Sequence, residues 1–276
     1  MRGYTLSIDD GIAHLILNRP EASNALGANF WNSLPGDIWE LDKSGEVTSL
    51  VISAEGKNFC SGMDLSEFST GIPETNTPEE REAFYHLALS LQETFTCLER
   101  TRFPVISSIQ GACVGAGLEL AAACDIRFAT HDCFFRIEEI NTGIMADVGA
   151  LQRLPKILPE PVVKEMAFLG TPLPAERASH FGLVSDTLSS TPEEALKQAL
   201  KAAKIIGQKA PVAIAGSKSA LHWARDHSIS DSLEWSARTQ SSLWSKHDIM
   251  ASIASRMHKT PAKYSQLGKK KLLGET

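Results

Sequence analysis

The sequence predicts an α/β fold, because strand patterns and helix patterns alternate through most of the chain. Short apolar runs bounded by Asn, Gly or Pro are typical of strands, and longer segments with helical spacing of apolar residues come between them. After about residue 187 the strand patterns stop, while helical patterns continue. We therefore expect an α/β core over residues 1–190 and a helical region over residues 191–276.

The first elements of the core follow one another clearly. Residues 12–17 are a short apolar run closed by Asn-Arg-Pro, which predicts a strand that meets a loop. Apolar spacing predicts a helix near 25–42, and the run at 50–54 predicts a second strand. Pro78 with two glutamates after it is typical of a helix start, and this helix should reach about Arg100.

The remaining elements complete the pattern. Gly115-Ala116-Gly117 should open a short helix that contains Glu119. Three further strands are expected, at 105–109, 126–130 and 133–140. The helical region shows four patterns, near residues 192–207, 211–224, 229–245 and 247–258. It also carries Trp223, Trp235 and Trp244, and such large apolar groups often pack against a partner.

Composition and charge exclude several classes of function. With 43% hydrophobic and 22% charged residues, the composition is that of a soluble globular protein. A net charge of −6 gives no general attraction for nucleic acid or anionic membranes. The weakly polar stretch 104–124 contains Gln110, Glu119 and three glycines, so it fits a buried strand and helix better than a membrane span.

Cysteine and histidine patterns exclude metal and serine-triad chemistry. The five cysteines have no C-x-x-C spacing and three of them lie among small apolar residues, which indicates reduced thiols in an intracellular setting. The eight histidines form no H-x-x-x-H pair, and no G-x-S-x-G motif is present. The N-terminus has no signal-peptide pattern. We expect a cytoplasmic protein without a metal, with mitochondrion or peroxisome as alternatives for a eukaryotic source.

Three carboxylates in unusual surroundings give the strongest indication of chemistry. Glu119, Glu139 and Asp147 fall within 29 residues, each at a position where an apolar residue or glycine would be safer. Charged groups are rarely buried without a partner, because removing them from water costs several kcal/mol. Acids in apolar surroundings have raised pKa values and can move protons near neutral pH.

Each acid also has a structural interpretation. Glu119 falls in the first turn of a helix, where the helix dipole favours a carboxylate. On a strand at 133–140, Glu139 faces inward with apolar neighbours and Glu138 faces the opposite way. Asp147 could cap a helix that begins at Val148, and a cap stays ionised, so its role as acid or as base remains open.

Two turns of small residues could bind a negatively charged oxygen. The segment 111–117 follows a strand and opens a helix, but the third glycine of a dinucleotide fingerprint would fall at Leu120, so that motif fails. Residues 59–65 form a second such turn. If the N–H groups of Met63 and Ala116 pointed at one spot, they would form an oxyanion hole. The alternative is that the small residues only permit close packing.

Four ordered motifs resemble the crotonase (enoyl-CoA hydratase/isomerase) superfamily over about residues 4–186, and the helical tail is also similar. The motifs are Leu17-Asn18-Arg19-Pro20 with Asn24-Ala25-Leu26, residues 59–65, residues 115–125 and Leu151-Gln152-Arg153-Leu154. The resemblance implies a spiral of ββα units with a C-terminal helical trimerisation region, assembled as a homotrimer or a dimer of trimers. It also implies an acyl-CoA substrate and no separate cofactor.

The resemblance assigns roles to residues of both turns. It implies that the thioester oxygen lies between the N–H groups of Met63 and Ala116, where the family usually has glycine at the second position. Further substrate contacts are expected from five residues of the same two turns, Ser61, Gly62, Asp64, Leu65 and Gly117.

The three acids distinguish two subgroups of the superfamily. In hydratases two glutamates act on water and match Glu119 and Glu139, but the position of Asp147 is normally glycine. A third acid resembles the Δ3,5-Δ2,4-dienoyl-CoA isomerases, whose first acid is usually aspartate rather than glutamate. Their reaction removes a proton at C2 and delivers one at C6, which needs two separated groups.

We expect Glu139 to be the C2 base, Asp147 the C6 acid, and Glu119 a neighbour that tunes Glu139, although base and acid could be reversed. One alternative is an enoyl-CoA hydratase that uses Glu119 and Glu139. Another is a non-catalytic relative that binds RNA, against which the negative charge and the complete acid set argue.

Overall fold

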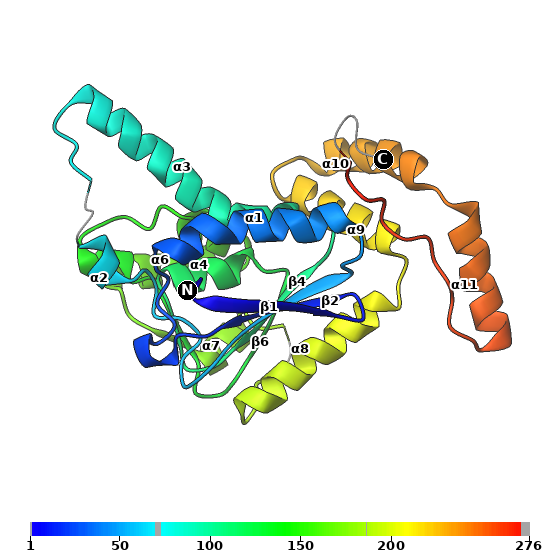
Figure 1. The fold of residues 1–276 in the computed structure, drawn as a ribbon, viewed down its shortest axis with the longest axis horizontal. Helices are drawn as coiled ribbons and strands as arrows, with labels where there is room; N and C mark the ends of the chain where they lie inside the picture. The colour runs from blue at the N-terminus through cyan, green and yellow to red at the C-terminus, as the bar shows by residue number, and fades with distance from the viewer. Residues whose placement is uncertain (1, 70–72, 186, 272–276) are drawn as a thin grey trace.

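The computed structural model describes residues 2–69, 73–185 and 187–271 and has the expected α/β architecture (Figure 1). Within these residues, five strands form the main sheet, in the order β1-β2-β3-β4-β6. The hairpin of β1 (Tyr4–Asp9) and β2 (Ile12–Leu17) is antiparallel. The remaining strands are β3 (Ser49–Ala54), β4 (Val105–Ile109) and β6 (Ile126–Ala129). The pairs β2–β3, β3–β4 and β4–β6 are all parallel.

Helices cover both faces of this sheet. In Figure 1, α1 (Ala28–Ser44) and α3 (Pro78–Arg100) lie above the sheet and α8 (Pro192–Gly207) lies below it. The middle strands β3 and β4 are buried almost throughout, as expected for parallel strands covered on both faces. On the α8 side, Ala199 and Ala203 pack against a strand cluster of Ile12, Val51, Ile106 and Phe128.

A small second sheet carries part of the candidate site. It contains β5 (Ala112–Val114), β7 (Phe134–Arg136) and β8 (Leu173–Pro174). The helix α4 (Ala116–Ala123) follows β5 directly, and all of its residues are buried. Three other helices close this side of the core, α5 (Ala150–Arg153), α6 (Glu160–Leu169) and α7 (Ala175–His180).

The predicted strand at 133–140 is wrong in its second half. The strand β7 ends at Arg136, because its partners β5 and β8 are only three and two residues long and offer no further ladder. Glu139 instead begins the 3-10 helix η2 (Glu139–Thr142). The proposed cap at Asp147 is also wrong, because α5 begins at Ala150, with Gly149 at its N-cap.

Short irregular elements occupy the remaining connections. The 3-10 helix η1 (Pro20–Ala22) follows β2, and the one-turn helix α2 (Leu65–Phe68) follows the turn after β3. A third 3-10 helix, η3 (Leu154–Lys156), continues from α5. Within the described residues, no helix is long and apolar enough to cross a membrane.

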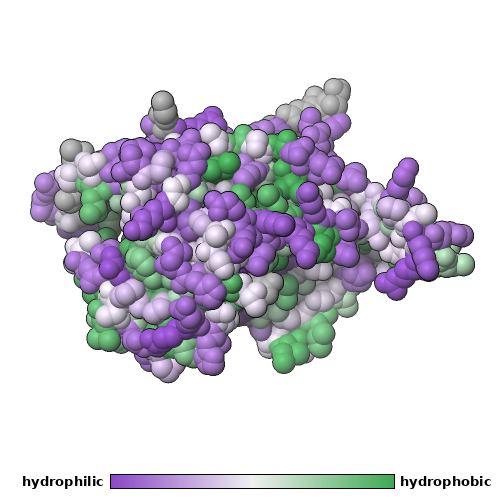
Figure 2. Space-filling model, turned by 90° about the horizontal axis from the view of Figure 1, so that it is seen from below, coloured by the Kyte–Doolittle hydropathy of each residue, from purple (hydrophilic) through white to green (hydrophobic). Residues whose placement is uncertain are grey.

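The helical tail consists of α9 (Pro211–Arg225), α10 (Ile229–Leu243) and α11 (Lys246–His258). Large apolar side chains are exposed on it, among them Leu221, Ile229, Leu233, Trp244, Met250 and Met257. Figure 2 shows that apolar residues gather in separate patches among hydrophilic ones on the face seen from below. The domain division at residue 190 stays a prediction. The helix α8 follows that boundary and packs on the sheet of the core. Residues 1, 70–72, 186 and 272–276 lie outside the described residues.

A buried lysine attaches the tail to the core. The Lys218 ammonium on α9 donates hydrogen bonds to the carbonyls of Leu98 and Phe103, at 2.8 and 3.0 Å, and to the Thr101 hydroxyl at 3.0 Å. It also forms an ion pair of 2.8 Å with Asp125. A buried charge is tolerated when it is paired and hydrogen-bonded in this way.

Removing this charge should weaken the attachment of the tail. We expect Lys218→Met to lower the stability by about 3–5 kcal/mol, because the partly buried Asp125 and the buried acceptors at the end of α3 would lose their ammonium donor. Thermal unfolding at fixed protein concentration measures the loss. Lys164→Met, which removes an exposed ion pair with Glu160, is the matched control and should leave the melting temperature unchanged. Equal melting temperatures for the two variants would contradict this account of Lys218.

Candidate active site

The two small-residue turns meet in the structure. Backbone hydrogen bonds join Cys60 to Ala112 and Val114, at 3.0 Å each, as a parallel bridge beside β5. A Cβ on Gly62, which has φ +102°, would lie 3.2 Å from the Val114 carbonyl oxygen and 3.7 Å from the Ala116 nitrogen. The turn after β3 therefore contacts the N-terminus of α4.

Both predicted oxyanion donors have free N–H groups. Ala116 is the first residue of α4, and the first N–H groups of a helix have no intrahelical partner. Around Met63, the Gly62 carbonyl and the Asp64 N–H bond to Leu26, at 2.8 and 3.0 Å, so the Met63 N–H lies outside this pairing. Among the described residues, neither N–H donates to a protein acceptor. Their convergence on one oxygen stays a prediction.

The other predicted contact residues have different surroundings. Ser61 and Leu65 are exposed, with Leu65 at 62%. Gly117 lies against Cys60, where a Cβ would be 2.7 Å from the Cys60 carbonyl oxygen. Asp64 caps α2 and pairs with Arg19 at 2.9 Å, and hydrogen bonds from Ser66 and Arg19 lower its pKa. Asp64 and Gly117 therefore shape the turn, whatever they contribute to a substrate.

Glu119 is the most deeply buried of the three acids, at 1% exposure. It lies in the first turn of α4, and its carboxylate accepts a hydrogen bond of 3.2 Å from the Ala150 N–H at the start of α5. Burial, and next the charge of Glu139, raise the pKa of Glu119 to about 8. Glu119 therefore holds a proton at neutral pH.

Glu139, in η2 just after β7 of the second sheet, lies against the same end of α4. A Cβ on Gly115, the N-cap of α4, would lie 3.2 Å from the Glu139 Oε1 atom. The Oε2 atom is buried and has no hydrogen-bond partner among the described residues. Burial raises the pKa of Glu139. Glu138, in contrast, forms an ion pair with Arg136.

Asp147 completes the group of acids. It is partly buried in the segment between η2 and α5, and its backbone carbonyl accepts a hydrogen bond of 2.8 Å from the Gln92 side chain on α3. Its charge contributes to the raised pKa of Glu119 and of Glu139, so the three acids lie close enough to interact. The structure thus brings together the acids that the sequence singled out.

Asp147 also lines a polar cavity of about 420 Å³ that the sequence did not predict. The other lining residues include Gln92, Thr96, Glu99, Arg153 and Arg225. Arg153 belongs to one of the motifs quoted above, but no periodicity or spacing indicated its partners. Its partner Glu99 lies 54 residues earlier in the chain, in the regular pattern of α3.

Comparisons with known proteins agree with this arrangement. The model of the enoyl-CoA hydratase/isomerase family matches residues 7–267. A mitochondrial Δ3,5-Δ2,4-dienoyl-CoA isomerase of Mus musculus is 38% identical, over 91% of this chain and 78% of its own. A peroxisomal Δ3,5-Δ2,4-dienoyl-CoA isomerase of Arabidopsis thaliana is 34% identical, over 94% of each chain. A solved enoyl-CoA hydratase of Polaromonas sp. JS666 has a TM-score of 0.85 and 26% identity, covering 95% of this chain and 99% of that one.

The raised pKa of Glu119 predicts a pH-dependent stability. The folded protein holds this proton up to about pH 8, whereas the unfolded chain releases it near the ordinary value of 4.5. The contribution of this protonation to the free energy of unfolding is then complete below about pH 4.5 and is lost as the pH rises to about 8. We expect Glu119→Gln to match the parent protein at pH 4.5 and to melt several degrees higher at pH 8.

Thermal unfolding across this pH range measures the difference between variant and parent. The exposed Glu82 on α3 offers the control, and Glu82→Gln should leave the pH dependence unchanged. A difference between Glu119→Gln and the parent that stays constant with pH would refute the assignment of the raised pKa to Glu119.

Proposed function

The chain belongs to the enoyl-CoA hydratase/isomerase family, also called the crotonase family, and we propose that it is a Δ3,5-Δ2,4-dienoyl-CoA isomerase. Membership of the family means that the protein is an enzyme that acts on an unsaturated acyl-CoA. The presence of Asp147 beside Glu119 and Glu139 is the observation that favours the dienoyl-CoA isomerase reaction. The dienoyl-CoA isomerases among its relatives, at 34–38% identity, support it.

The reaction separates proton removal from proton delivery. A base takes a proton from C2 of the 3,5-dienoyl thioester, and the charge spreads from the thioester oxygen to C6. An acid then protonates C6, which leaves double bonds at C2 and C4. One carboxylate cannot easily serve both ends, so two separated groups are needed.

We assign the C2 proton to Glu139 and the C6 proton to Asp147, which must be protonated when the substrate binds. After turnover Glu139 holds the proton taken from C2, and a proton must pass from Glu139 back to Asp147 to regenerate the enzyme. Glu119 holds its proton at neutral pH, so Glu139 rather than Glu119 is the candidate base. The buried and unpartnered Oε2 atom of Glu139 favours this choice, because no protein donor competes for it within the described residues. Glu119 then tunes Glu139 by holding a proton beside it.

The dienolate oxygen would be held by the N–H groups of Met63 and Ala116. Two fixed donors at this oxygen stabilise the charge that develops in the transition state, by about 3 kcal/mol for each donor. The substrate would contact the two turns through five residues, Ser61, Gly62, Asp64, Leu65 and Gly117. No cofactor is needed beyond the coenzyme A that the substrate carries.

We also propose that the protein is a homotrimer or a dimer of trimers that binds no nucleic acid and no membrane. The exposed apolar side chains of the tail support assembly through α9–α11. The relatives reported above are named mitochondrial and peroxisomal, so those compartments join the cytoplasm as proposed locations.

Enoyl-CoA hydratase activity is the second candidate. The coupling of Glu119 and Glu139 favours it, because a hydratase would use these two acids on one water molecule. In that case Asp147 would have no role in the chemistry. The two candidates therefore predict opposite results for a change of Asp147.

A two-substrate assay of Asp147→Asn tests the proposed function. The parent protein should convert a 3,5-dienoyl-CoA to a conjugated 2,4-dienoyl-CoA, followed by ultraviolet absorbance, and should hydrate a 2-enoyl-CoA poorly. Asp147→Asn should lower kcat for isomerisation by about 10²–10⁴-fold, because the C6 acid is lost. Glu138→Gln is the control, since it removes a neighbouring carboxylate that pairs with Arg136. Isomerisation at the parental rate in Asp147→Asn would rule out the proposed role.

Ala116 allows a direct test of the oxyanion hole. Proline has no N–H and is well tolerated at the first position of a helix, so Ala116→Pro deletes the donor while the helix start is kept. We expect kcat to fall by about 10²–10³-fold, with little change in thermal stability. Ala116→Gly keeps the N–H and should retain activity. Similar activity of the two variants would exclude this N–H as a donor to the substrate.

A further inference from the structure

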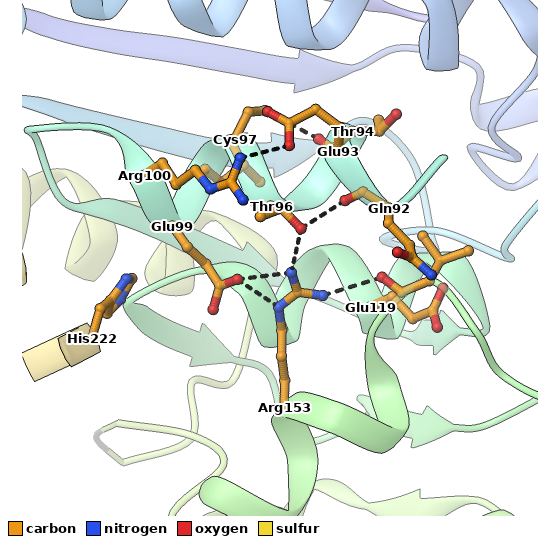
Figure 3. A network of polar contacts seen from close by, with 12 residues as sticks. Gln92, Glu93, Thr94, Thr96, Cys97, Glu99, Arg100, Glu119, Arg153 and His222 are labelled. Atoms are coloured by element: carbon orange, nitrogen blue, oxygen red, sulfur yellow. Dashed lines mark hydrogen bonds and ion pairs between the residues drawn. The ribbon is translucent and has the colours of Figure 1, made fainter. Parts of the chain in front are cut away.

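We propose that Arg153 is a positioning residue that holds the turn carrying Asp147, and that Glu99 and Arg225 connect this arginine to the helical tail. This inference deepens the proposed function and rests on it, because it concerns how Asp147 is placed for proton transfer. Glu99, Arg153 and Arg225 come from α3, α5 and α9, which lie far apart in the sequence. Figure 3 shows the Arg153 guanidinium pointing toward Glu99 and Thr96.

Arg153 contacts the turn of Asp147, Val148 and Gly149 directly. One guanidinium nitrogen donates a hydrogen bond of 3.1 Å to the Val148 carbonyl. Gly149 has φ +139°, and a Cβ there would lie 1.6 Å from the Arg153 Nη1 atom. The guanidinium therefore occupies the space that a side chain at position 149 would need. The turn between Asp147 and Ala150 is therefore fitted around this arginine.

The same turn places two of the three acids. Asp147 precedes Val148 directly, and the Ala150 N–H that follows Gly149 donates to the Glu119 carboxylate. A shift of the Val148 carbonyl would move both groups. The Arg153 guanidinium does not hydrogen-bond to Glu119 or Glu139 in the described structure, so it would act through the turn.

Glu99 fixes the guanidinium in place. Its Oε2 atom accepts hydrogen bonds from the Arg153 Nε and Nη2 atoms, at 3.0 and 2.8 Å. The Nη2 atom also donates a hydrogen bond of 3.0 Å to the Thr96 hydroxyl. Burial opposes the ionisation of Glu99, but the hydrogen bonds and charges of Arg153 and Arg225 hold its pKa below the usual range. Such a planar fork of donors orients the guanidinium as well as binding it.

Arg225 brings the helical tail into the network. It is the last residue of α9 and donates to the other oxygen of Glu99 at 2.7 Å. The Arg225 carbonyl accepts a hydrogen bond of 3.2 Å from Lys156, just beyond α5. The end of α9 is thus linked to the catalytic turn through two arginines and one carboxylate.

The polar cavity beside Asp147 explains why ionic contacts hold this turn. Charged and amide groups line it, and an apolar acyl chain would leave them without hydrogen-bond partners. Water suits such a space better than a hydrocarbon chain does. On this side the turn is bonded by two polar side chains, Gln92 at the Asp147 carbonyl and Arg153 at the Val148 carbonyl. Its position therefore depends on them, and on Arg153 above all, because Gly149 is fitted around the guanidinium.

A buried ion network could also serve stability alone, and removing one partner of such a network usually weakens the fold. The two roles differ in where the effect appears. A positioning residue changes the turn and the rate constant, while a purely structural one lowers the stability of the whole domain. Local exchange and turnover must therefore be measured together.

Arg153→Lys is the main test, because lysine keeps the charge but cannot form the fork. We expect faster hydrogen–deuterium exchange in peptides covering residues 144–150, with the rest of the chain unchanged. We expect kcat to fall by about 10–100-fold with KM nearly constant, as for a misplaced catalytic group. Arg100→Lys is the control, since Arg100 forms an exposed ion pair of 3.0 Å with Glu93 on the same helix α3.

Arg153→Ala adds a rescue experiment, because the cavity that Arg153 lines could admit a free guanidinium ion. Guanidinium chloride, below the concentration that unfolds the protein, should restore part of the lost kcat, and sodium chloride at equal ionic strength should not. Unchanged exchange at 144–150, unchanged kcat, or exchange raised equally across the chain would each overturn the inference.

These outcomes are distinguishable from a failure of the proposed function. If Asp147→Asn keeps full isomerase activity, the role of Asp147 falls, while the exchange experiment still decides whether Arg153 holds the turn. If the parent protein acts only on a 2-enoyl-CoA, the Arg153 variants are assayed with that substrate. The rate should still fall, because the Ala150 N–H on the same turn bonds to Glu119.

Discussion

The close approach of three carboxylates in a buried site is the constraint on which the rest of the structure depends. Like charges at short range in a poorly solvated site cannot all stay ionised, so at least one must hold its proton. Burial raises the pKa of Glu119 to about 8, which makes it the acid that keeps its proton at neutral pH. Different environments can thus give chemically similar acids different protonation states.

Bringing these acids together requires backbone from several segments to meet closely. Glycines permit this: Gly62 contacts the start of α4, Gly115 faces the Glu139 carboxylate, and Gly149 makes room for Arg153. Each would meet a neighbour at 3.2 Å or less if it carried a Cβ. The two N–H groups left free by this close packing are the ones suited to bind an oxyanion.

Local patterns predicted the regular elements well, because each depends on residues near in sequence. The bounds of β2 and α3 were predicted as the structure has them, and the four helical patterns after residue 190 correspond to α8–α11. Glu139 was wrongly assigned to a strand, since the length of β7 is set by its partner strands. The Arg153 network was not predicted, because its members are brought together only by the fold: Arg225 lies 126 residues from Glu99. The assignment of the acids to catalysis stays a prediction.

The ion pair between Arg225 and Glu99 connects the helical tail to the candidate site. Lys218 and Arg225 are both on α9, and both bind to groups at the C-terminal end of α3, the first through the Leu98 carbonyl and the second through Glu99. The helix α9 also packs on α10, whose apolar side chains are exposed. The ion network of Arg225, Glu99 and Arg153 therefore connects the turn beside Asp147 to the part of the tail that exposes apolar surface.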